Sequence, residues 1–145
     1  MKVSEVMTRD VVVANPRQSI CDAAKLMAES DMGALPVGEN DRLVGVITDR
    51  DIAVRAVAKR LSPDTPVRDV MSQEVLYCFE DEEVEHVARN MADQQVRRLP
   101  VLNREKRLIG IVSIGDLALH AKPKTAGEAI AGISRPGGLH DQTIH

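Results

Sequence analysis

The chain has 145 residues, a formal net charge of −3 and a pI near 5.8, so it carries no global basic field for nucleic acids or other polyanions. Only one Tyr, one Phe and no Trp are present, which disfavours the aromatic platforms of single-stranded nucleic-acid binders. No apolar run approaches the ~20 residues of a membrane span, and the N-terminus lacks a signal-peptide stretch. We therefore expect a cytoplasmic protein that binds neither membrane nor nucleic acid.

The first predicted elements are a short strand and an amphipathic helix. Val11–Val13 is a β-branched run that ends at the turn signal Asn15-Pro16, which predicts a strand. Ser19 is a plausible N-cap, with an acid three residues later that suits the helix dipole. The helical stripe that follows has i, i+3, i+4, i+7 spacing: Ile20, Ala23, Ala24 and Met27.

A hairpin and a second helix follow. Residues 34–37 and 43–48 read as two strands joined by a turn at 38–41, and the second strand is almost wholly apolar. The second helix opens at Asp49. Residues 52–58 are apolar nearly all round the helix, so we expect them to be buried against the other half of the chain, another chain, or both.

The same pattern then returns. Residues 3–13 reappear at 67–77, and Leu35-Pro36-Val37 reappears 64 residues later at 99–101. Arg42–Gly45 returns after 65 residues at Arg107–Gly110, so the second copy has one inserted residue. Each copy reads strand, helix, strand, strand, helix, an α/β (α+β) fold class. Two copies of one unit indicate two half-modules with paired sites.

We divide the chain into three parts. Residues 1–62 form repeat 1 with its N-terminal segment, and residues 63–122 form repeat 2. Residues 123–145 follow the second repeat, with a possible helix over 125–133 and an expected mobile tail or arm over 134–145.

A hydroxyl and an acid follow the buried strand in both copies: Thr48 and Asp51, then Ser113 and Asp116. A strand that gives way to a helix N-terminus offers unpaired N–H groups to an anion, and the acid can accept hydrogen bonds from a ribose diol. The alternative is that the hydroxyl or Asp49 merely caps the helix. Recurrence of the pair favours binding.

Together these motifs resemble the cystathionine β-synthase (CBS) domain, in a tandem pair called a Bateman module. The resemblance covers about residues 1–121 and rests on the V-M-T and V-M-S openings and on four further segments: Gly33–Val37, Arg98–Val101, Gly45–Asp51 and Gly110–Asp116. It implies two β-α-β-β-α units related by a pseudo-twofold axis, with two clefts. It also implies a regulatory ligand that is an adenine nucleotide (AMP, ADP, ATP or NAD) or sometimes S-adenosylmethionine, with no cofactor required.

The resemblance further implies that each cleft combines the acid of one repeat with the segment before the L-P-V strand of the other. Cleft 1 would use Thr48, Arg50, Asp51, Val96, Arg97 and Arg98. Cleft 2 would use Met32, Gly33, Ala34, Ser113 and Asp116. The guanidinium groups collect in cleft 1, since the second copy has Gly115 in place of Arg50. We predict that cleft 1 is the better phosphate site, although Arg97 and Arg98 could instead be a solvated pair at a helix end.

No residue pattern predicts catalysis or a metal. The four histidines have no H-x-x-H spacing, and no nucleophile–base pair can be argued, so we expect a non-enzyme without catalytic residues. Cys21 and Cys78 form no C-x-x-C and are expected to be buried, inert thiols.

Two functions remain open. The leading one is a regulatory nucleotide sensor that acts through an unknown partner protein, because the chain carries no effector domain. The alternative is a ligand-independent interaction scaffold with vestigial clefts. A homodimer is expected in both cases, through the apolar faces of 52–57 and 117–119.

Overall fold

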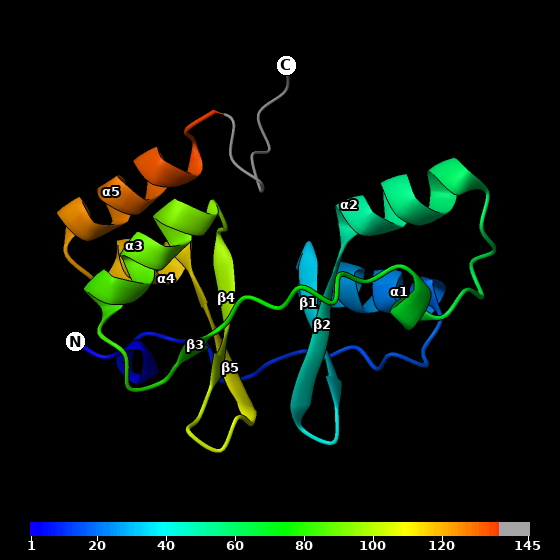
Figure 1. Ribbon diagram of the computed structural model, residues 1–145, viewed down its shortest axis with the longest axis horizontal. Coiled ribbons are helices and arrows are strands. Elements are labelled where there is room, and N and C mark those ends of the chain that lie inside the picture. Colours follow the sequence, from blue (N-terminus) through cyan, green and yellow to red (C-terminus); the bar gives the residue numbers. More distant parts are fainter. Residues whose placement is uncertain (137–145) are drawn as a thin grey trace. The chain divides into compact units, whose positions relative to one another are not determined.

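The computed structural model describes residues 1–136 and divides the chain into two compact units (Figure 1). Unit 2 is nearly contiguous, comprising residues 12–75 with residues 106–108. Unit 1 is assembled from three stretches of chain: residues 1–11, residues 76–105 and the part from Ile109 onward. Both units mix helices with strands, which confirms the predicted fold class.

Unit 2 contains a helix and a hairpin in the predicted order. Helix α1 (Ile20–Ser30) begins where the Ser19 hydroxyl accepts a hydrogen bond from Asp22 N at 3.0 Å, which confirms the N-cap. Strands β1 (Ala34–Glu39) and β2 (Arg42–Thr48) pair antiparallel. The core of the unit comprises residues from α1, both strands and the segment that follows the second helix: Ala14, Ile20, Ala23, Met27, Leu35, Val37, Ile47, Ala56, Val67, Val70 and Met71.

The strand predicted at Val11–Val13 is wrong. This segment forms no strand, and only its neighbour Ala14 makes an isolated parallel bridge, to Val37. Two features explain the difference. Val13 is 39% exposed while Val12 packs against the core of unit 2, so only part of the run is covered, and the chain turns immediately afterwards at Asn15-Pro16.

The second helix of unit 2 begins at the predicted residue but departs from α-helical geometry. Helix α2 (Asp49–Asp51) widens into a π-helical segment (Ile52–Ala56) and tightens into a 3₁₀ turn (Val57–Lys59). The apolar residues 52–58 are not buried on several sides within the unit. Only Ala56 is buried, while Val54 and Val57 are 47% and 67% exposed.

Unit 1 has a three-stranded sheet in the order β3-β4-β5. Strand β3 (Cys78–Phe79) runs parallel to β4 (Arg98–Leu102), and β5 (Leu108–Ser113) follows β4. Helix α3 (Val84–Gln94) buries Val84, Val87, Ala88 and Met91, a stripe with the same i, i+3, i+4, i+7 spacing as the one predicted at the first helix. Helix α4 (Ile114–His120) begins directly after β5. The core of this unit draws on all these elements and on the N-terminal segment: Val3, Val6, Cys78, Val84, Val87, Ala88, Met91, Leu99, Val101, Val112, Leu117, Ala126 and Ala129.

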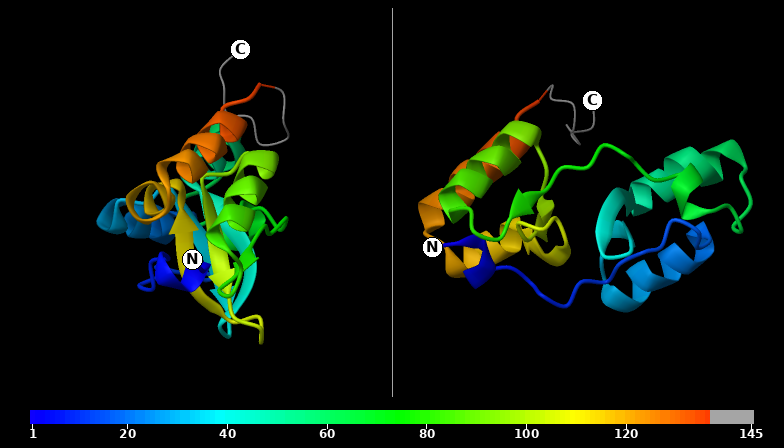
Figure 2. Two further views of the ribbon diagram at one scale, coloured as in Figure 1. Left: turned by 90° about the vertical axis from the view of Figure 1, so that its left-hand side faces the viewer. Right: turned by 60° about the horizontal axis from the view of Figure 1, so that its bottom comes forward.

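The last helix of unit 1, α5 (Pro123–Ile133), confirms the helix expected over 125–133. It lies beside α3 in every view and also contacts α4 (Figure 2). The expected mobile tail falls mostly on residues 137–145, outside the described residues.

The opening segments of the two sequence repeats are exchanged between the units. Val3 N donates to Glu82 O at 3.0 Å, and Thr8 bridges to Ile111, so the opening of repeat 1 belongs to unit 1. Val67 N donates in the same way to Gln18 O at 2.7 Å, which places the opening of repeat 2 in unit 2. Each unit is therefore completed by the opening segment of the other repeat.

Candidate ligand-binding site

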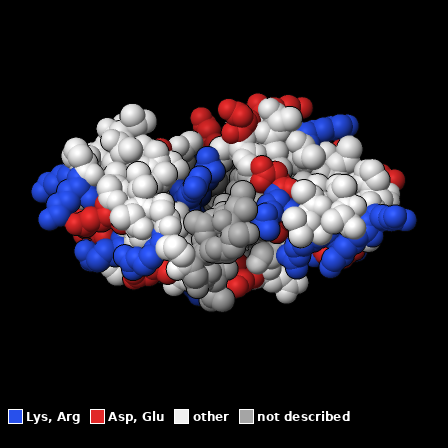
Figure 3. All heavy atoms as spheres, turned by 90° about the horizontal axis from the view of Figure 1, so that it is seen from above, with Lys and Arg blue, Asp and Glu red and all other residues white. Residues whose placement is uncertain are grey.

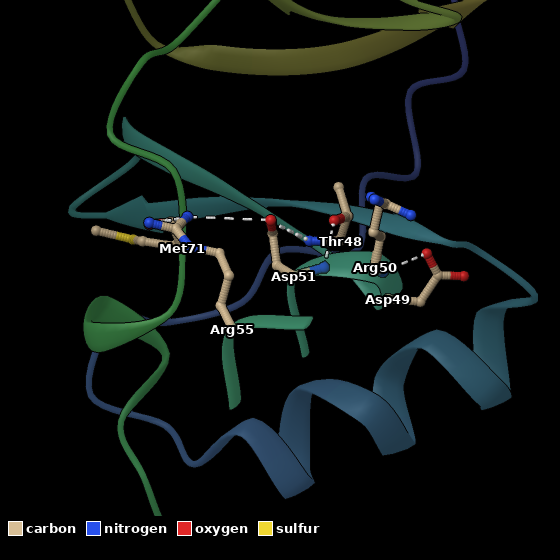
Figure 4. Close-up of polar contacts among 6 residues, drawn as sticks. All are labelled: Thr48, Asp49, Arg50, Asp51, Arg55 and Met71. Carbon is tan, nitrogen blue, oxygen red and sulfur yellow. Dashed lines mark hydrogen bonds and ion pairs between the residues drawn. The ribbon is translucent and has the colours of Figure 1, made fainter. Parts of the chain in front are cut away.

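The Thr48–Asp51 pair of unit 2 forms a reciprocal hydrogen-bonded box (Figure 4). The Thr48 hydroxyl accepts from Asp51 N at 3.0 Å, and Asp51 Oδ2 accepts from Thr48 N at 3.0 Å. The side chain of Asp51 is only 20% exposed. Because one carboxylate oxygen is fixed by the backbone, the orientation of the other is fixed as well.

The Ser113–Asp116 pair of unit 1 repeats this geometry. The Ser113 hydroxyl accepts from Asp116 N at 3.1 Å, and Asp116 Oδ2 accepts from Ser113 N at 2.8 Å. A capping box alone is an ordinary way to begin a helix. Its presence at equivalent strand–helix junctions in both units gives the protein two similarly oriented carboxylates.

Each junction lies beside the segment before the L-P-V strand of its own unit. Ala34 pairs with Thr48, and Asp49 N donates to Gly33 O at 2.9 Å. A Cβ on Gly33 would lie 3.0 Å from Asp49 Oδ2, so this carboxylate sits directly against the glycine. In unit 1, Ile114 N donates to Arg97 O at 2.9 Å.

The structure thus brings Gly33 and Ala34 to Thr48 in one unit, and Arg97 to the Ser113–Asp116 junction in the other. The grouping of Thr48 and Asp51 with Val96, Arg97 and Arg98, and that of Ser113 and Asp116 with Met32, Gly33 and Ala34, stays a prediction. Met32 and Val96 are half-buried and pack against the cores of their own units, while Arg97 and Arg98 are exposed.

Arg55 is a site residue that the sequence analysis missed. Its guanidinium donates to Met71 O at 3.4 Å and lies 4.0 Å from Asp51 Oδ1. Figure 4 shows Arg50 and Arg55 on opposite sides of Asp51. The sequence signal that could have identified Arg55 is its i, i+4 spacing from Asp51. The equivalent position in the second repeat, four residues after Asp116, also carries a basic side chain, His120.

Unit 1 has an open pocket of about 210 Å³ near its own junction. It is lined by one cation, one hydroxyl and three isoleucines: Arg97, Ser134, Ile114, Ile130 and Ile133. The sequence analysis missed the contribution of α5, although the i, i+3 spacing of Ile130 and Ile133 could have indicated a shared face.

The surface charge is mixed. On the face drawn in Figure 3, groups of Lys and Arg lie among groups of Asp and Glu, and residues of other types make up most of the visible surface. Within residues 1–136 no three His, Cys, Asp or Glu side chains are grouped so that they could hold a metal ion. The described helices include none with the length and apolar character needed to cross a bilayer.

The chain is built from two copies of one α/β unit, and each copy has a hydroxyl–acid box at the junction between a strand and a helix. This arrangement defines a tandem-repeat module. The CBS-domain family model matches residues 3–57 and 67–122, and the chain belongs to this family as a tandem pair. The CBS domain-containing protein YhcV of Bacillus subtilis is 41% identical over 144 residues, which cover 99% of this chain and 98% of YhcV.

Solved structures agree with this assignment. Hypoxic Response Protein I with two coordinated zinc ions has a TM-score of 0.76 at 34% identity, covering 83% of this chain and 98% of that one. CBSX2 in complex with AMP has a TM-score of 0.73 at 30% identity, covering 83% and 95%. These similarities confirm the fold and the family, whose members include regulatory and nucleotide-binding proteins.

Proposed function

We propose that the protein is a regulatory, non-catalytic module that binds an adenine nucleotide and signals through a partner protein. The observation that carries the proposal is the oriented carboxylate of Asp51, held by Thr48 in a geometry that unit 1 repeats with Ser113 and Asp116. A carboxylate with one oxygen fixed presents the other to the two hydroxyls of a ribose. The AMP complex of CBSX2 supports this ligand class.

The phosphate end of the nucleotide is assigned to the arginines. Arg50 is exposed at the α2 N-terminus, where its guanidinium group is free to pair with phosphate oxygens. Arg97 and Arg98 are exposed in unit 1. Because Gly115 stands where Arg50 does in the first copy, we propose that the Thr48–Asp51 junction binds phosphorylated ligands more strongly than the Ser113–Asp116 junction.

Isothermal titration with AMP, ADP, ATP and NAD tests the proposal. We expect binding below millimolar for at least one of them, and at least a tenfold loss with Asp51→Asn. The matched control is Asp49→Asn, which removes an exposed carboxylate two residues away on the same turn. Binding that survives Asp51→Asn unchanged, or the absence of binding to the wild type, overturns the assignment.

A second proposal, self-association, rests on exposed apolar side chains. Val54 and Val57 in unit 2 are 47% and 67% exposed, and Leu119 on α4 is 79% exposed. Exposed apolar side chains that gather on a helix surface are typical of interfaces. A homodimer that docks other proteins without nucleotide is the alternative function, and this surface is compatible with both functions.

Sedimentation velocity separates the possibilities. We expect a dimer whose monomer fraction rises with Val57→Glu but not with Lys59→Glu, a change of charge at a nearby exposed position. A wild-type monomer at the highest soluble concentration would contradict self-association. A dimer that captures its partner equally with and without nucleotide would favour the scaffold.

A further inference from the structure

The second carboxylate oxygen of Asp51 faces a guanidinium group from its own unit. Asp51 Oδ2 accepts from Thr48 N, which leaves Oδ1 for a further partner. Nη1 of Arg55 lies 4.0 Å from Asp51 Oδ1 and donates to the backbone oxygen of Met71 at 3.4 Å (Figure 4). One N–H donor therefore stands opposite the carboxylate oxygen that the proposed function assigns to the ribose.

The carbonyl group that orients Arg55 is itself fixed by backbone hydrogen bonds. Met71 belongs to the opening of repeat 2, and its N–H donates to Val67 O at 2.9 Å. The next residue, Ser72, exchanges two backbone hydrogen bonds with Val46 of β2, at 2.9 and 3.0 Å. Because the Met71 carbonyl and the Ser72 N–H belong to one planar peptide group, the pairing with β2 sets the direction of this carbonyl.

The helix that carries Arg55 changes its geometry at this point. Ile52–Ala56 form a π-helical segment, in which hydrogen bonds span five residues instead of four. The wider turn aims its side chains differently from those of a regular helix, and such segments are frequent at functional sites. The equivalent helix α4 of unit 1 is a regular α-helix, and the position equivalent to Arg55 holds the exposed His120. The arrangement of Arg55 is therefore specific to unit 2.

The distance between Arg55 and Asp51 suits a bridging group better than a direct hydrogen bond. At 4.0 Å, Nη1 and Oδ1 are separated by more than the ~2.7–3.2 Å of an N–H···O bond. A hydroxyl oxygen about 2.8 Å from both atoms closes a triangle with an angle of about 90° at the hydroxyl. This hydroxyl would donate to the carboxylate and accept from the guanidinium, so that both of its hydrogen-bonding functions are used.

The alternative is that Arg55 and Asp51 form only a surface ion pair. Their side chains are 48% and 20% exposed, and an exposed i, i+4 pair contributes little to stability. The additional bond to the Met71 carbonyl anchors the guanidinium beside the carboxylate, which an ion pair alone does not require. This anchor favours a role in binding.

We propose that Arg55 determines ligand specificity at the Thr48–Asp51 junction. A ribose hydroxyl donates to Asp51 Oδ1 and accepts from Arg55 Nη1, while the Met71 carbonyl positions the guanidinium. The inference rests on the proposed nucleotide-binding function and narrows its ligand class to nucleotides with an intact ribose diol. It involves residues of unit 2 alone.

Isothermal titration with AMP, 2′-deoxyAMP and 3′-deoxyAMP tests the assignment. For the wild type we expect at least one deoxy analogue to bind at least tenfold more weakly than AMP, because the missing hydroxyl leaves both partners unpaired. Arg55→Met removes the donor at an exposed position and keeps an apolar side chain of similar reach, so the core stays intact. This variant should weaken AMP at least fivefold and lower the preference for AMP over that analogue at least threefold.

The preference is the decisive measurement, because a general loss of positive charge weakens AMP and its deoxy analogues equally and cancels from their ratio. Lys59→Met is the matched control, since it removes a positive charge from an exposed residue four positions after Arg55. It should leave the preference for AMP within twofold of wild type. Equal losses of preference in the two variants would overturn the assignment.

The outcomes also separate this inference from the proposed function. If the wild type binds none of AMP, ADP, ATP and NAD, the proposed function fails and the role of Arg55 fails with it. If the wild type binds AMP and Asp51→Asn weakens it, while Arg55→Met keeps the wild-type preference, only the assignment of Arg55 is wrong. Equal binding of AMP and both deoxy analogues by the wild type would also overturn that assignment, because no ribose hydroxyl is then recognised.

Discussion

The sulfur of Met7 lies so close to Gly110 that a Cβ on the glycine would be 2.7 Å away from it. The same Cβ would be 2.9 Å from the Thr8 carbonyl oxygen. Unit 2 has an equivalent contact, where a Cβ on Gly45 would lie 2.7 Å from the sulfur of Met71. In both units, a methionine from the opening of one repeat thus packs on a glycine from a strand of the other repeat.

Gly110→Ala should destabilise unit 1 by about 1–3 kcal/mol, because the added methyl group meets a backbone oxygen as well as a flexible side chain. Urea unfolding followed by circular dichroism gives the free energy of unfolding. Gly127→Ala, on the open side of α5, should change it by less than about 1 kcal/mol or raise it slightly, because alanine favours a helix by about 1 kcal/mol. Similar losses from the two variants would contradict this prediction.

Val3 and Val67 occupy equivalent positions in the two repeats, and both are fully buried. Replacing either with alanine removes two carbons from a core and should cost about 2 kcal/mol. The exchange of opening segments predicts where protection is lost in native-state hydrogen exchange. Val3→Ala should lower protection in α3 and β4, and Val67→Ala in α1 and β1. The reverse pattern would show that each opening packs within its own repeat.

Cys78 should resist alkylation in the folded protein. Burial, assisted by the charge of Glu82, raises the pKa of its thiol from an ordinary 9.0 to about 12. Between pH 9.0 and about 12, the thiol is therefore protonated in the folded protein but ionised in the unfolded chain. Its contribution to stability is complete below pH 9 and is lost as the pH rises toward 12.

Mass spectrometry after iodoacetamide treatment at about pH 8.5 tests the prediction. Cys21 is half-buried rather than buried as expected from the sequence, so it should react first, and both cysteines should react in urea. Rapid modification of Cys78 in the native protein would contradict the prediction.

Asp81 should titrate below its ordinary value. Two hydrogen bonds from Arg104, at 2.7 and 2.9 Å, lower the pKa of the Asp81 carboxyl from 3.8. Its contribution to stability is therefore present above pH 3.8 and lost as the pH falls through the lowered value. NMR titration of the Asp81 side-chain carboxyl should show this midpoint, and Arg104→Gln should return it to about 3.8. An unchanged midpoint in the variant would exclude the pair as the cause.

The hydroxyl–acid boxes could be predicted from the sequence because their geometry is local. Thr48 and Asp51 are three residues apart, so the start of a helix brings them together wherever the helix lies. The helix over 125–133 was predictable for the same reason. Its role as a wall of the pocket was not, because that depends on Gly132 meeting Ala92, a contact between distant segments.

The exchanged openings could not be predicted from the repeat. A sequence repeat shows which residues are equivalent, and Met7 and Met71 are equivalent whether each packs on its own repeat or on the other. The apolar character of residues 52–57 predicted burial against the other half of the chain, another chain, or both. Within the unit the π-helical segment buries only Ala56, so burial of the remaining side chains against a second chain stays a prediction.

The exchange of openings also affects the order in which the chain can fold as it is synthesised. Almost all of unit 2 has left the ribosome once residue 75 has emerged, so its core can close early. Unit 1 must bring its first eleven residues to segments that are made much later, including Ile111. The N-terminal segment is thus made first and completes its contacts last, with Val3 and Val6 unpacked until the second half of the chain is available.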